Sequence, residues 1–377
     1  MTYKLFLTMF SIFICLLSFL ILSRALLLNN YPDFKVNYYG ATHLLSHKNP
    51  YLTDLRYFTP QVYPPVDMVF FIPLVVFPEA IAAKIWISLS IMCVISSVWL
   101  LTRVYSISFF SLPNMIFLTG VFLAFPFKFT LGMGQINAVL LWFVCLAFYF
   151  YKQKRNLLAG SLLAFPLLIK FFPLLLVPYF FYLRKWRVLL GVVCFSVYLI
   201  LISLYFVPLD TQVYFVTKIL PSLLMSWKGD YYNQALSGLV MRSVSDPVLR
   251  TTLKLGVSII LVLITAGIIL LRKQTEKVQD LSIACIITLS ILINNFSWQH
   301  HYLFLLLPFF IVYRHIRLLK YPTWHYGILF VAYLFIMYNI KSPASFPPLV
   351  LSHVFYGGLI LWGQCLYLLW KEKHQTT

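Results

Sequence analysis

The residue best suited to catalysis in this chain is Asp33, which directly follows the first long apolar run. It lies in an aromatic, proline-containing stretch that includes Tyr31 and Tyr39. A carboxylate within reach of a hydroxyl group can take its proton and so activate a poor nucleophile. The ordinary alternative for an aspartate at such a place is a helix cap or a solvated charge. Asp33 is therefore a candidate general base, with the structural alternative still open.

Four further polar motifs interrupt the apolar runs. Amide side chains offer the donors and acceptors that sugar hydroxyls require, and guanidinium or ammonium groups suit a phosphate. Each motif also has a plain structural explanation, such as a glycine turn, a snorkelling lysine or an ordinary polar loop. The motifs are Gly134-Gln135-Ile136-Asn137, Ile169-Lys170-Phe171-Phe172-Pro173, Tyr231-Tyr232-Asn233-Gln234 with Arg242, and Ser297-Trp298-Gln299-His300-His301.

The histidines do not indicate a metal site. His300 and His301 are adjacent in sequence, so their side chains project in different directions from a helix. Neither the His-Glu-x-x-His pattern nor a facial carboxylate triad is present. We therefore predict no metal and no cofactor.

Composition indicates that membrane helices position these residues. Hydrophobic residues make up 61% of the 377-residue chain and charged residues only 10%, whereas soluble domains carry about twice that charge. The apolar runs are long and do not alternate, which favours helices over a barrel. We expect an all-α, polytopic bundle of about twelve transmembrane helices forming one integral membrane domain, 1–377. The expected spans are 5–28, 82–102, 110–126, 135–151, 157–169, 171–183, 187–208, 251–271, 279–295, 301–319, 324–340 and 350–370.

The net charge of +19 reflects membrane topology and not nucleic-acid binding. Lysines and arginines gather in alternate breaks between apolar runs, as the positive-inside rule describes. One orientation places all these breaks and both termini in the cytoplasm. The same orientation places outside the breaks 29–65, 134–137, 209–250, 294–301 and 341–349. Segment 66–78, bracketed by prolines, is too short for a clear span and is expected to be re-entrant if it does not cross.

Taken together, the motifs resemble glycosyltransferase family 87, the polyprenyl-phosphate-sugar-dependent mannosyltransferases of the GT-C superfamily. The resemblance covers roughly residues 1–310 and rests on the joint order of short pieces. These pieces are Asp-Phe-x-x-Tyr-Tyr from Asp33, Asn-Pro-Tyr at 49–51, Tyr-Pro-Pro at 63–65, Gly-Gln-Ile-Asn at 134–137, the stretch from Ala159 to Pro173, Asn-Gln at 233–234 and Ser-Trp-x-His-His at 297–301.

The resemblance implies a GT-C bundle with juxtamembrane helices in the first outer loop, 29–65, and a second long outer loop, 209–250. It implies inverting transfer of a hexose, most simply mannose, from a polyprenyl-phosphate donor to a hydroxyl of a glycolipid or polysaccharide. The reaction would occur at the outer or periplasmic face of the cytoplasmic membrane, with Asp33 as the catalytic base. The expected donor-phosphate ligands are Arg242, Lys170, His300 and His301, and the expected sugar or acceptor ligands are Gln135, Asn137, Asn233, Gln234 and Tyr63.

The other acidic residues expected outside form no second motif carboxylate, which fits a mechanism with a single base. They are Asp54, Asp67, Asp210, Asp230 and Asp246.

Two alternatives share much of this pattern. A transporter or flippase of a lipid-linked saccharide also has many spans and broken helices, but such proteins often contain internal repeats, and the motifs of the first half do not recur in the second. A GT-C enzyme with another donor sugar, such as arabinose or glucose, would keep the architecture and the role of Asp33.

Overall fold

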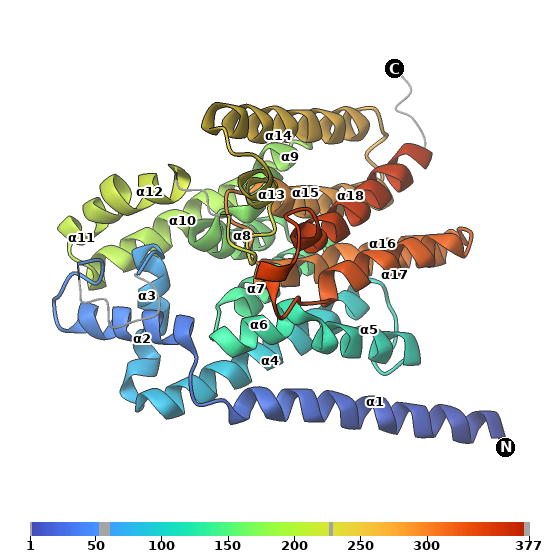
Figure 1. The fold of residues 1–377 in the computed structure, drawn as a ribbon, viewed down its shortest axis with the longest axis horizontal. Helices are drawn as coiled ribbons and strands as arrows, with labels where there is room; N and C mark the ends of the chain where they lie inside the picture. Colours follow the sequence, from blue (N-terminus) through green and yellow to red (C-terminus); the bar gives the residue numbers. More distant parts are fainter. Residues whose placement is uncertain (1, 53–60, 226–228, 373–377) are drawn as a thin grey trace. The chain divides into compact units, whose positions relative to one another are not determined.

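The computed structural model describes residues 2–52, 61–225 and 229–372, and regular structure in these ranges is helical (Figure 1). The α-helices are α1 (Thr2–Leu27), α2 (Pro32–Leu45), α3 (Pro65–Phe71), α4 (Glu79–Val104), α5 (Leu112–Leu123), α6 (Phe125–Met133), α7 (Asn137–Lys152), α8 (Asn156–Lys170), α9 (Leu176–Tyr182), α10 (Trp186–Phe206), α11 (Leu209–Tyr214), α12 (Leu220–Met225), α13 (Leu236–Ser243), α14 (Pro247–Leu270), α15 (Glu276–Ile293), α16 (Leu306–Leu318), α17 (Trp324–Met337) and α18 (His353–Lys371).

Short 3-10 or π segments extend several of these helices. They are η1 (Ile72–Val76), η2 (Phe172–Leu175), η3 (Phe215–Ile219), η4 (Gln299–Leu305), η5 (Pro343–Ser345) and η6 (Val350–Ser352).

The chain forms two compact units. The first comprises Met1–Leu123, Phe127–Phe171 and Tyr179–Met225, and the second comprises Ala124–Pro126, Phe172–Pro178 and Ser226–Thr377. Each unit has its own polar cluster, so each is described by itself below.

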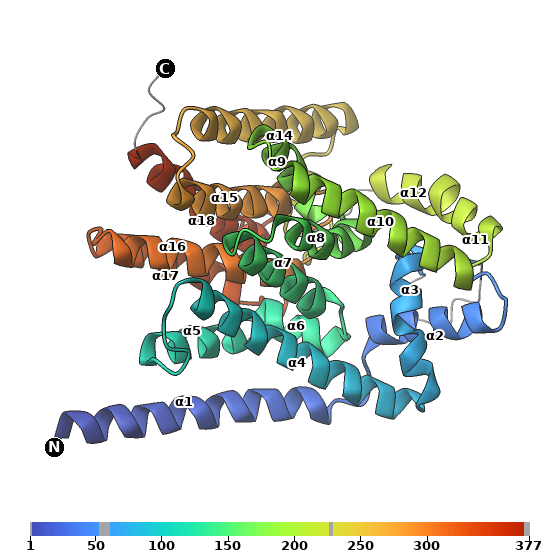
Figure 2. The same ribbon diagram turned by 180° about the vertical axis from the view of Figure 1, so that it is seen from behind.

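In the first unit, α4 packs on α7, α7 on α8 and α8 on α10 (Figure 2). Glycines allow the closest of these contacts. A Cβ atom on Gly160 of α8 would overlap the carbonyl oxygen of Val188 in α10, and one on Gly191 would overlap that of Leu157. Small residues let membrane helices approach to backbone contact, so these two glycines set the crossing of α8 and α10.

The segment after α1 folds into α2, α3 and η1, which pack against one another. Its aromatic and charged residues fasten it to the start of α4. The Lys35 ammonium lies 3.1 Å from Glu79 Oε1, the Tyr39 hydroxyl donates to Glu79 Oε2 at 2.6 Å, and the Tyr38 hydroxyl donates to the Phe77 carbonyl at 2.8 Å. The described part of the first polar break thus contains helix α2 and is fastened to the start of α4. Residues 53–60, including Asp54, lie outside the described residues.

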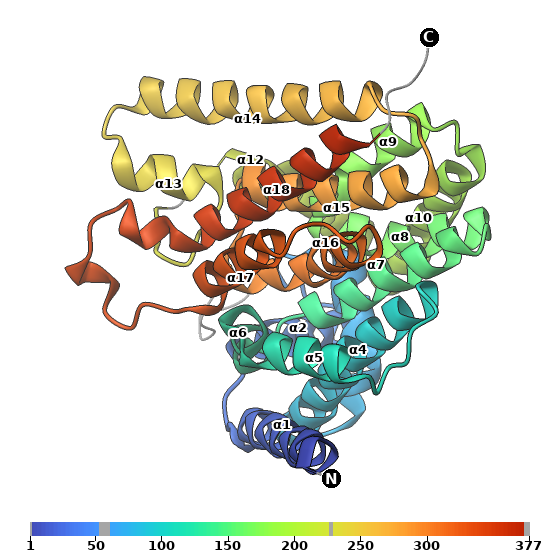
Figure 3. The same ribbon diagram turned by 90° about the vertical axis from the view of Figure 1, so that its right-hand side faces the viewer.

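In the second unit, α15 packs on α14, α16 and α18, and α17 packs on α18 (Figure 3). Helix α14 buries only the stripe Leu261, Thr265 and Ile269, spaced four residues apart. The exposed remainder includes Ile259, Ile260 and Leu263. An apolar surface on a helix that packs through one stripe is suited to contact with lipid.

Each expected span contains a helix or a helix pair, but the structure does not establish twelve crossings. Within the described residues, three helices are long and apolar enough to cross a membrane, namely α4, α10 and α14. The number rises to five if α1 with α2 and α5 with α6, bent by 48° and 55°, each form one span. Most remaining expected spans coincide with shorter helices, since prolines and polar motifs divide them.

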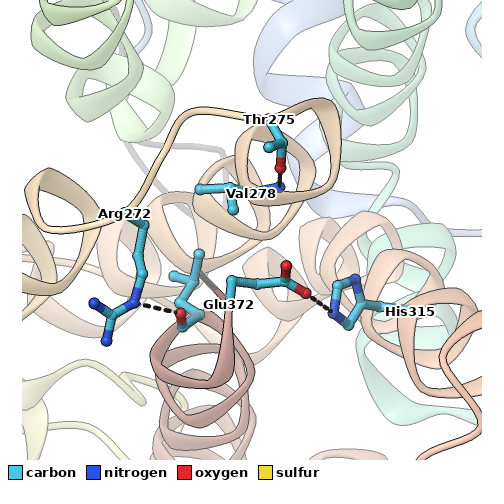
Figure 4. A network of polar contacts seen from close by, with 6 residues as sticks. Arg272, Thr275, Val278, His315 and Glu372 are labelled. Carbon is cyan, nitrogen blue, oxygen red and sulfur yellow. Dashed lines mark hydrogen bonds and ion pairs between the residues drawn. The ribbon is translucent and has the colours of Figure 1, made fainter. Parts of the chain in front are cut away.

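The end of α18 is fastened by a polar network in the second unit (Figure 4). Arg272, in the turn between α14 and α15, donates from Nε to the Leu369 carbonyl at 2.9 Å and from Nη2 to the Trp370 carbonyl at 3.0 Å. His315 Nε2 of α16 lies 3.1 Å from Glu372 Oε1. Thr275 accepts from the Val278 amide at 3.3 Å and so caps α15. Charged residues of basic breaks thus satisfy the last carbonyls of a helix.

Candidate functional site

Gln135 is the centre of a polar cluster in the first unit. Its amide Nε2 donates to Asp33 Oδ2, and its Oε1 accepts from the Tyr63 hydroxyl at 2.9 Å and from Lys170 Nζ at 2.9 Å. One amide therefore joins a carboxylate, a phenol and an ammonium that come from three separate sequence motifs. Gln135 and Asp33 are buried, whereas Tyr63 and Lys170 are partly exposed.

A tight turn brings Gln135 to Asp33. Gly134 has φ +71°, a left-handed conformation that favours glycine. A Cβ atom there would lie 2.5 Å from Phe34 Cβ and 3.0 Å from Tyr31 Cβ, so the turn packs directly on the start of α2. Trp86 of α4 donates from Nε1 to the Gly134 carbonyl at 2.9 Å and holds the turn in place.

Lys170 reaches the cluster from the end of α8. The helix ends there because Phe171 takes a left-handed conformation with φ 55°. The ammonium also lies 5.3 Å from the centre of the Tyr63 ring, within the range of a cation–π contact. The sequence leaves open whether Lys170 extends to water or meets a polar group. In the structure it binds the polar cluster that contains the buried carboxylate of Asp33.

The electrostatics of the cluster centre on Asp33, in the first turn of the polar helix α2. Burial raises the pKa of this carboxyl above its usual value, while the hydrogen bond from Gln135 and the charge of Lys170 oppose that rise. Burial, together with the nearby carboxylates, raises the pKa of the Tyr63 hydroxyl well above its usual value, so this hydroxyl stays a donor at neutral pH. Burial is the largest of these effects, so the pKa of Asp33 lies above its usual value, and Gln135 and Lys170 are the groups that favour its anionic form.

Asp67 interacts with residues of the same cluster. From the sequence it is only one of several acidic residues expected outside. It is fully buried in α3, and it interacts electrostatically with Lys170 and Tyr63. The signal in the sequence was its place two residues after the Tyr63-Pro64-Pro65 motif. A lone aspartate after prolines is most often a helix N-terminal residue, so that signal was weak.

A second polar cluster lies in the second unit, where two of the sequence motifs pair through their backbones. Asn233 and Trp298 form an antiparallel bridge. The Gln234 amide donates to the Ser297 carbonyl at 2.8 Å, and the Gln299 amide donates to the Tyr232 carbonyl at 2.9 Å. The Tyr231–Gln234 and Ser297–His301 motifs, far apart in sequence, are therefore neighbours, as a shared site requires.

The Asn233 and Gln234 side chains are fully buried and bind protein groups. Asn233 Oδ1 accepts from the Ala235 and Ser297 amides at 3.2 and 3.3 Å. Gln234 Nε2 donates to the Leu351 carbonyl at 2.7 Å, and its Oε1 accepts from the Phe355 amide at 3.3 Å. These amides hold the cluster together; their direct contact with a sugar stays a prediction.

Arg242 of α13 connects three segments of this cluster. Its Nη1 donates to the carbonyls of Asp230 and Asn233 at 2.9 and 2.8 Å, and its Nη2 donates to the Ser352 hydroxyl at 2.8 Å. Burial lowers the pKa of the guanidinium to about 10, so it remains charged at neutral pH. The charge is available to an anion, although the Nη atoms already have protein acceptors.

The two histidines differ in their surroundings. His301 Nδ1 accepts from the Trp298 amide at 3.1 Å, and the side chain is partly exposed. His300 is buried and its ring stacks on Trp298, with centroids 6.1 Å apart. The last predicted sugar ligand, Asn137, is fully buried at the first position of α7, two residues from Gln135. The structure thus joins Asp33, Tyr63, Gln135 and Lys170 in one cluster. It brings Asn233, Gln234 and Arg242 together with the Ser297–His301 motif in another.

Comparison with known proteins identifies the family of the chain. The model of glycosyltransferase family 87 matches residues 62–294, more than half of the chain. No curated protein and no solved structure matches. The matched range contains Tyr63, Gln135, Lys170 and Arg242, and it ends before the histidine pair.

Proposed function

Because the chain belongs to glycosyltransferase family 87, we propose that it transfers a hexose, in the first instance mannose, from a polyprenyl-phosphate donor to an acceptor hydroxyl. The acceptor is a glycolipid or polysaccharide at the outer face of the cytoplasmic membrane, and the anomeric configuration inverts. The observation that supports this most strongly is the cluster in which Gln135 joins Asp33, Lys170 and Tyr63.

Asp33 is the proposed general base. An acceptor hydroxyl attacks the anomeric carbon, its proton passes to Asp33, and the bond from that carbon to the phosphate oxygen breaks. The electron pair of the broken bond remains on the lipid phosphate. A positioned base contributes about 10²–10⁴-fold to such a step. Buried Asp33 suits this role because Gln135 fixes one oxygen, Oδ2, while Lys170 favours the anionic form.

The departing phosphate needs a cation as its charge develops. Lys170 is the candidate in the first unit, since its ammonium is partly exposed and lies in the cluster of the base. Arg242, His300 and His301 are the candidates in the second unit. Of the two histidines, His301 is the more exposed and so the better placed to meet a ligand.

We expect Tyr63 and Gln135 to bind sugar hydroxyls. In the structure the Tyr63 hydroxyl donates to Gln135 Oε1, so the pair offers both a donor and an acceptor. Asn137, Asn233 and Gln234 are proposed to support the same function from buried positions. Since the last two are committed to protein partners, their main contribution is expected to be the shape of the cluster, with direct sugar contact only after rearrangement.

Product formation from purified protein tests this function. The protein, in lipid nanodiscs, is supplied with polyprenyl-phosphate mannose, glucose or arabinose and a glycolipid acceptor. Transfer of mannose above the other two sugars supports the full proposal, and preference for another sugar changes only the donor. Absence of any transfer, with movement of the lipid-linked sugar across a vesicle membrane, would favour a flippase instead.

A further inference from the structure

Asp67 is a fully buried carboxylate in α3. Its exposed fraction is 0%, and neither Oδ1 nor Oδ2 accepts a hydrogen bond within the described part of the chain. Burial of an ionisable group without compensating hydrogen bonds is energetically unfavourable. Such groups are rare in native structures, and each calls for a specific explanation, a bound ligand or a catalytic role among them.

Other aspartates of the chain show the usual structural use of this side chain. Asp246 accepts from the Leu249 amide at 2.6 Å and caps α14, and Asp210 accepts from the Thr211 amide at 2.7 Å. Asp67 differs from both, since it is the third residue of α3 and follows Pro64 and Pro65, which have no backbone N–H to donate. It caps no amide, so helix capping does not explain its burial.

The surroundings of Asp67 are those of the base. Helix α3, which carries Asp67, packs on α2, which carries Asp33, and contacts α8, which ends at Lys170. Lys170 and Tyr63 each interact electrostatically with both carboxylates. Lys170 and Tyr63 are partly exposed while the two carboxylates are buried, so a substrate would meet the lysine and the tyrosine first. Within the described residues no group of three or more His, Cys, Asp or Glu side chains is placed to hold a metal ion. Two buried carboxylate oxygens that accept no hydrogen bond within the described residues match the hydrogen-bond donors of a ligand.

We propose that Asp67 is a second acidic residue of this site and that its two oxygens bind hydroxyl groups of the sugar being transferred. The inference rests on the proposed function, since it assumes a sugar donor whose phosphate lies near Lys170. The transferred sugar is attached to that phosphate, so its hydroxyls are the donors nearest to this region. A carboxylate offers about four acceptor sites and can bind two neighbouring hydroxyls at once.

The first test needs no substrate. Thermal unfolding in nanodiscs is compared for the wild type, Asp67→Asn and Asp280→Asn, the last a matched control because Asp280 is also buried but has a partner. We expect Asp67→Asn to unfold at the same temperature as the wild type or a few degrees higher, and Asp280→Asn to unfold lower. A loss of stability in Asp67→Asn as large as that in the control would overturn the proposal.

The second test identifies the hydroxyl. Rates are measured with polyprenyl-phosphate mannose and with its 2-, 3-, 4- and 6-deoxy analogues, or with the same series on glucose if that donor is preferred. For the wild type, one or two analogues should raise KM at least about tenfold. Asp67→Asn should have a similarly raised KM for the complete, non-deoxy donor. Its KM should not rise further with the one or two analogues that affect the wild type. Equal losses in both proteins with every analogue would refute the assignment.

The two tests separate this inference from the proposed function. If the wild type transfers no sugar, the function fails, while the unfolding comparison still decides whether Asp67 is held for a ligand. If transfer proceeds and depends on Asp33 but Asp67→Asn leaves KM unchanged for every analogue, the function stands and the role of Asp67 falls.

Discussion

Gln135 donates a hydrogen bond from its side-chain amide to Oδ2 of Asp33 across 102 residues of sequence. That contact connects the first polar break of the chain with the turn before α7. The hydrogen bond also fixes the orientation of the proposed base. Gln135 occupies only Oδ2 and leaves Oδ1 to meet an acceptor hydroxyl.

Replacement of Gln135 by alanine should slow transfer at least about tenfold, because the base loses its orienting donor. It should also change the pH profile. The hydrogen bond lowers the pKa of Asp33, so its loss raises that pKa and protonates the base at a higher pH. The acidic limb of the rate profile should therefore move to higher pH. A profile identical to that of the wild type would contradict this role.

Replacement of Gly134 by alanine should disrupt the turn. The added Cβ would lie 2.5 Å from Phe34 Cβ on a backbone with φ +71°, and both effects oppose folding of the turn on α2. We expect lower activity and a lower unfolding temperature. Gly132→Ala is the matched control, because its nearest neighbour would be 4.0 Å away in Leu28. Equal stability of the two variants would show that the turn tolerates a side chain.

Replacement of Lys170 by methionine tests the cation of the cluster. Its charge lowers the pKa of Asp33, so removal of that charge should again move the acidic limb of the rate profile to higher pH. Weaker donor binding should accompany the shift if Lys170 also contacts the phosphate. Lys128→Met serves as the control, since Lys128 is exposed on α6. Should the acidic limb of Lys170→Met stay in place, the electrostatic link between the two residues would be refuted.

The sequence predicts which residues belong to this site but not how they contact one another. Motif residues such as Asp33, Gln135 and Lys170 could be identified because polar groups in apolar surroundings are rare and costly. Their mutual hydrogen bonds could not, since each depends on the turn at Gly134 and on the end of α8. Asp67 was missed because its distinguishing features are structural. It is fully buried, and its oxygens accept no hydrogen bond within the described residues.

The fold shows the same division. Hydropathy predicts where helices occur, and helices are found at the expected positions such as α4, α10 and α14. Hydropathy does not predict how prolines and turns divide the remaining runs, as at the break between α5 and α6. Nor does it predict the backbone pairing of Asn233 with Trp298, because that contact depends on tertiary structure and not on local pattern.

Replacement of Arg242 by lysine should destabilise the second cluster although the charge is kept. A lysine cannot donate to the carbonyls of Asp230 and Asn233 and to Ser352 in the geometry of a guanidinium. We expect a fall of several degrees in unfolding temperature. Arg317→Lys, at an exposed position of α16, should leave it unchanged. Weaker donor binding by a stably folded Arg242→Ala would support the phosphate assignment, and unchanged donor affinity would remove it.

The central claim is that Asp33 removes the proton from the acceptor hydroxyl. It is tested most directly by the turnover number of Asp33→Asn with the donor that the wild type prefers, measured on protein whose unfolding temperature matches that of the wild type. The account predicts a fall of about 100-fold or more, because asparagine keeps the size of the side chain and loses the base. Turnover near that of the wild type would contradict it.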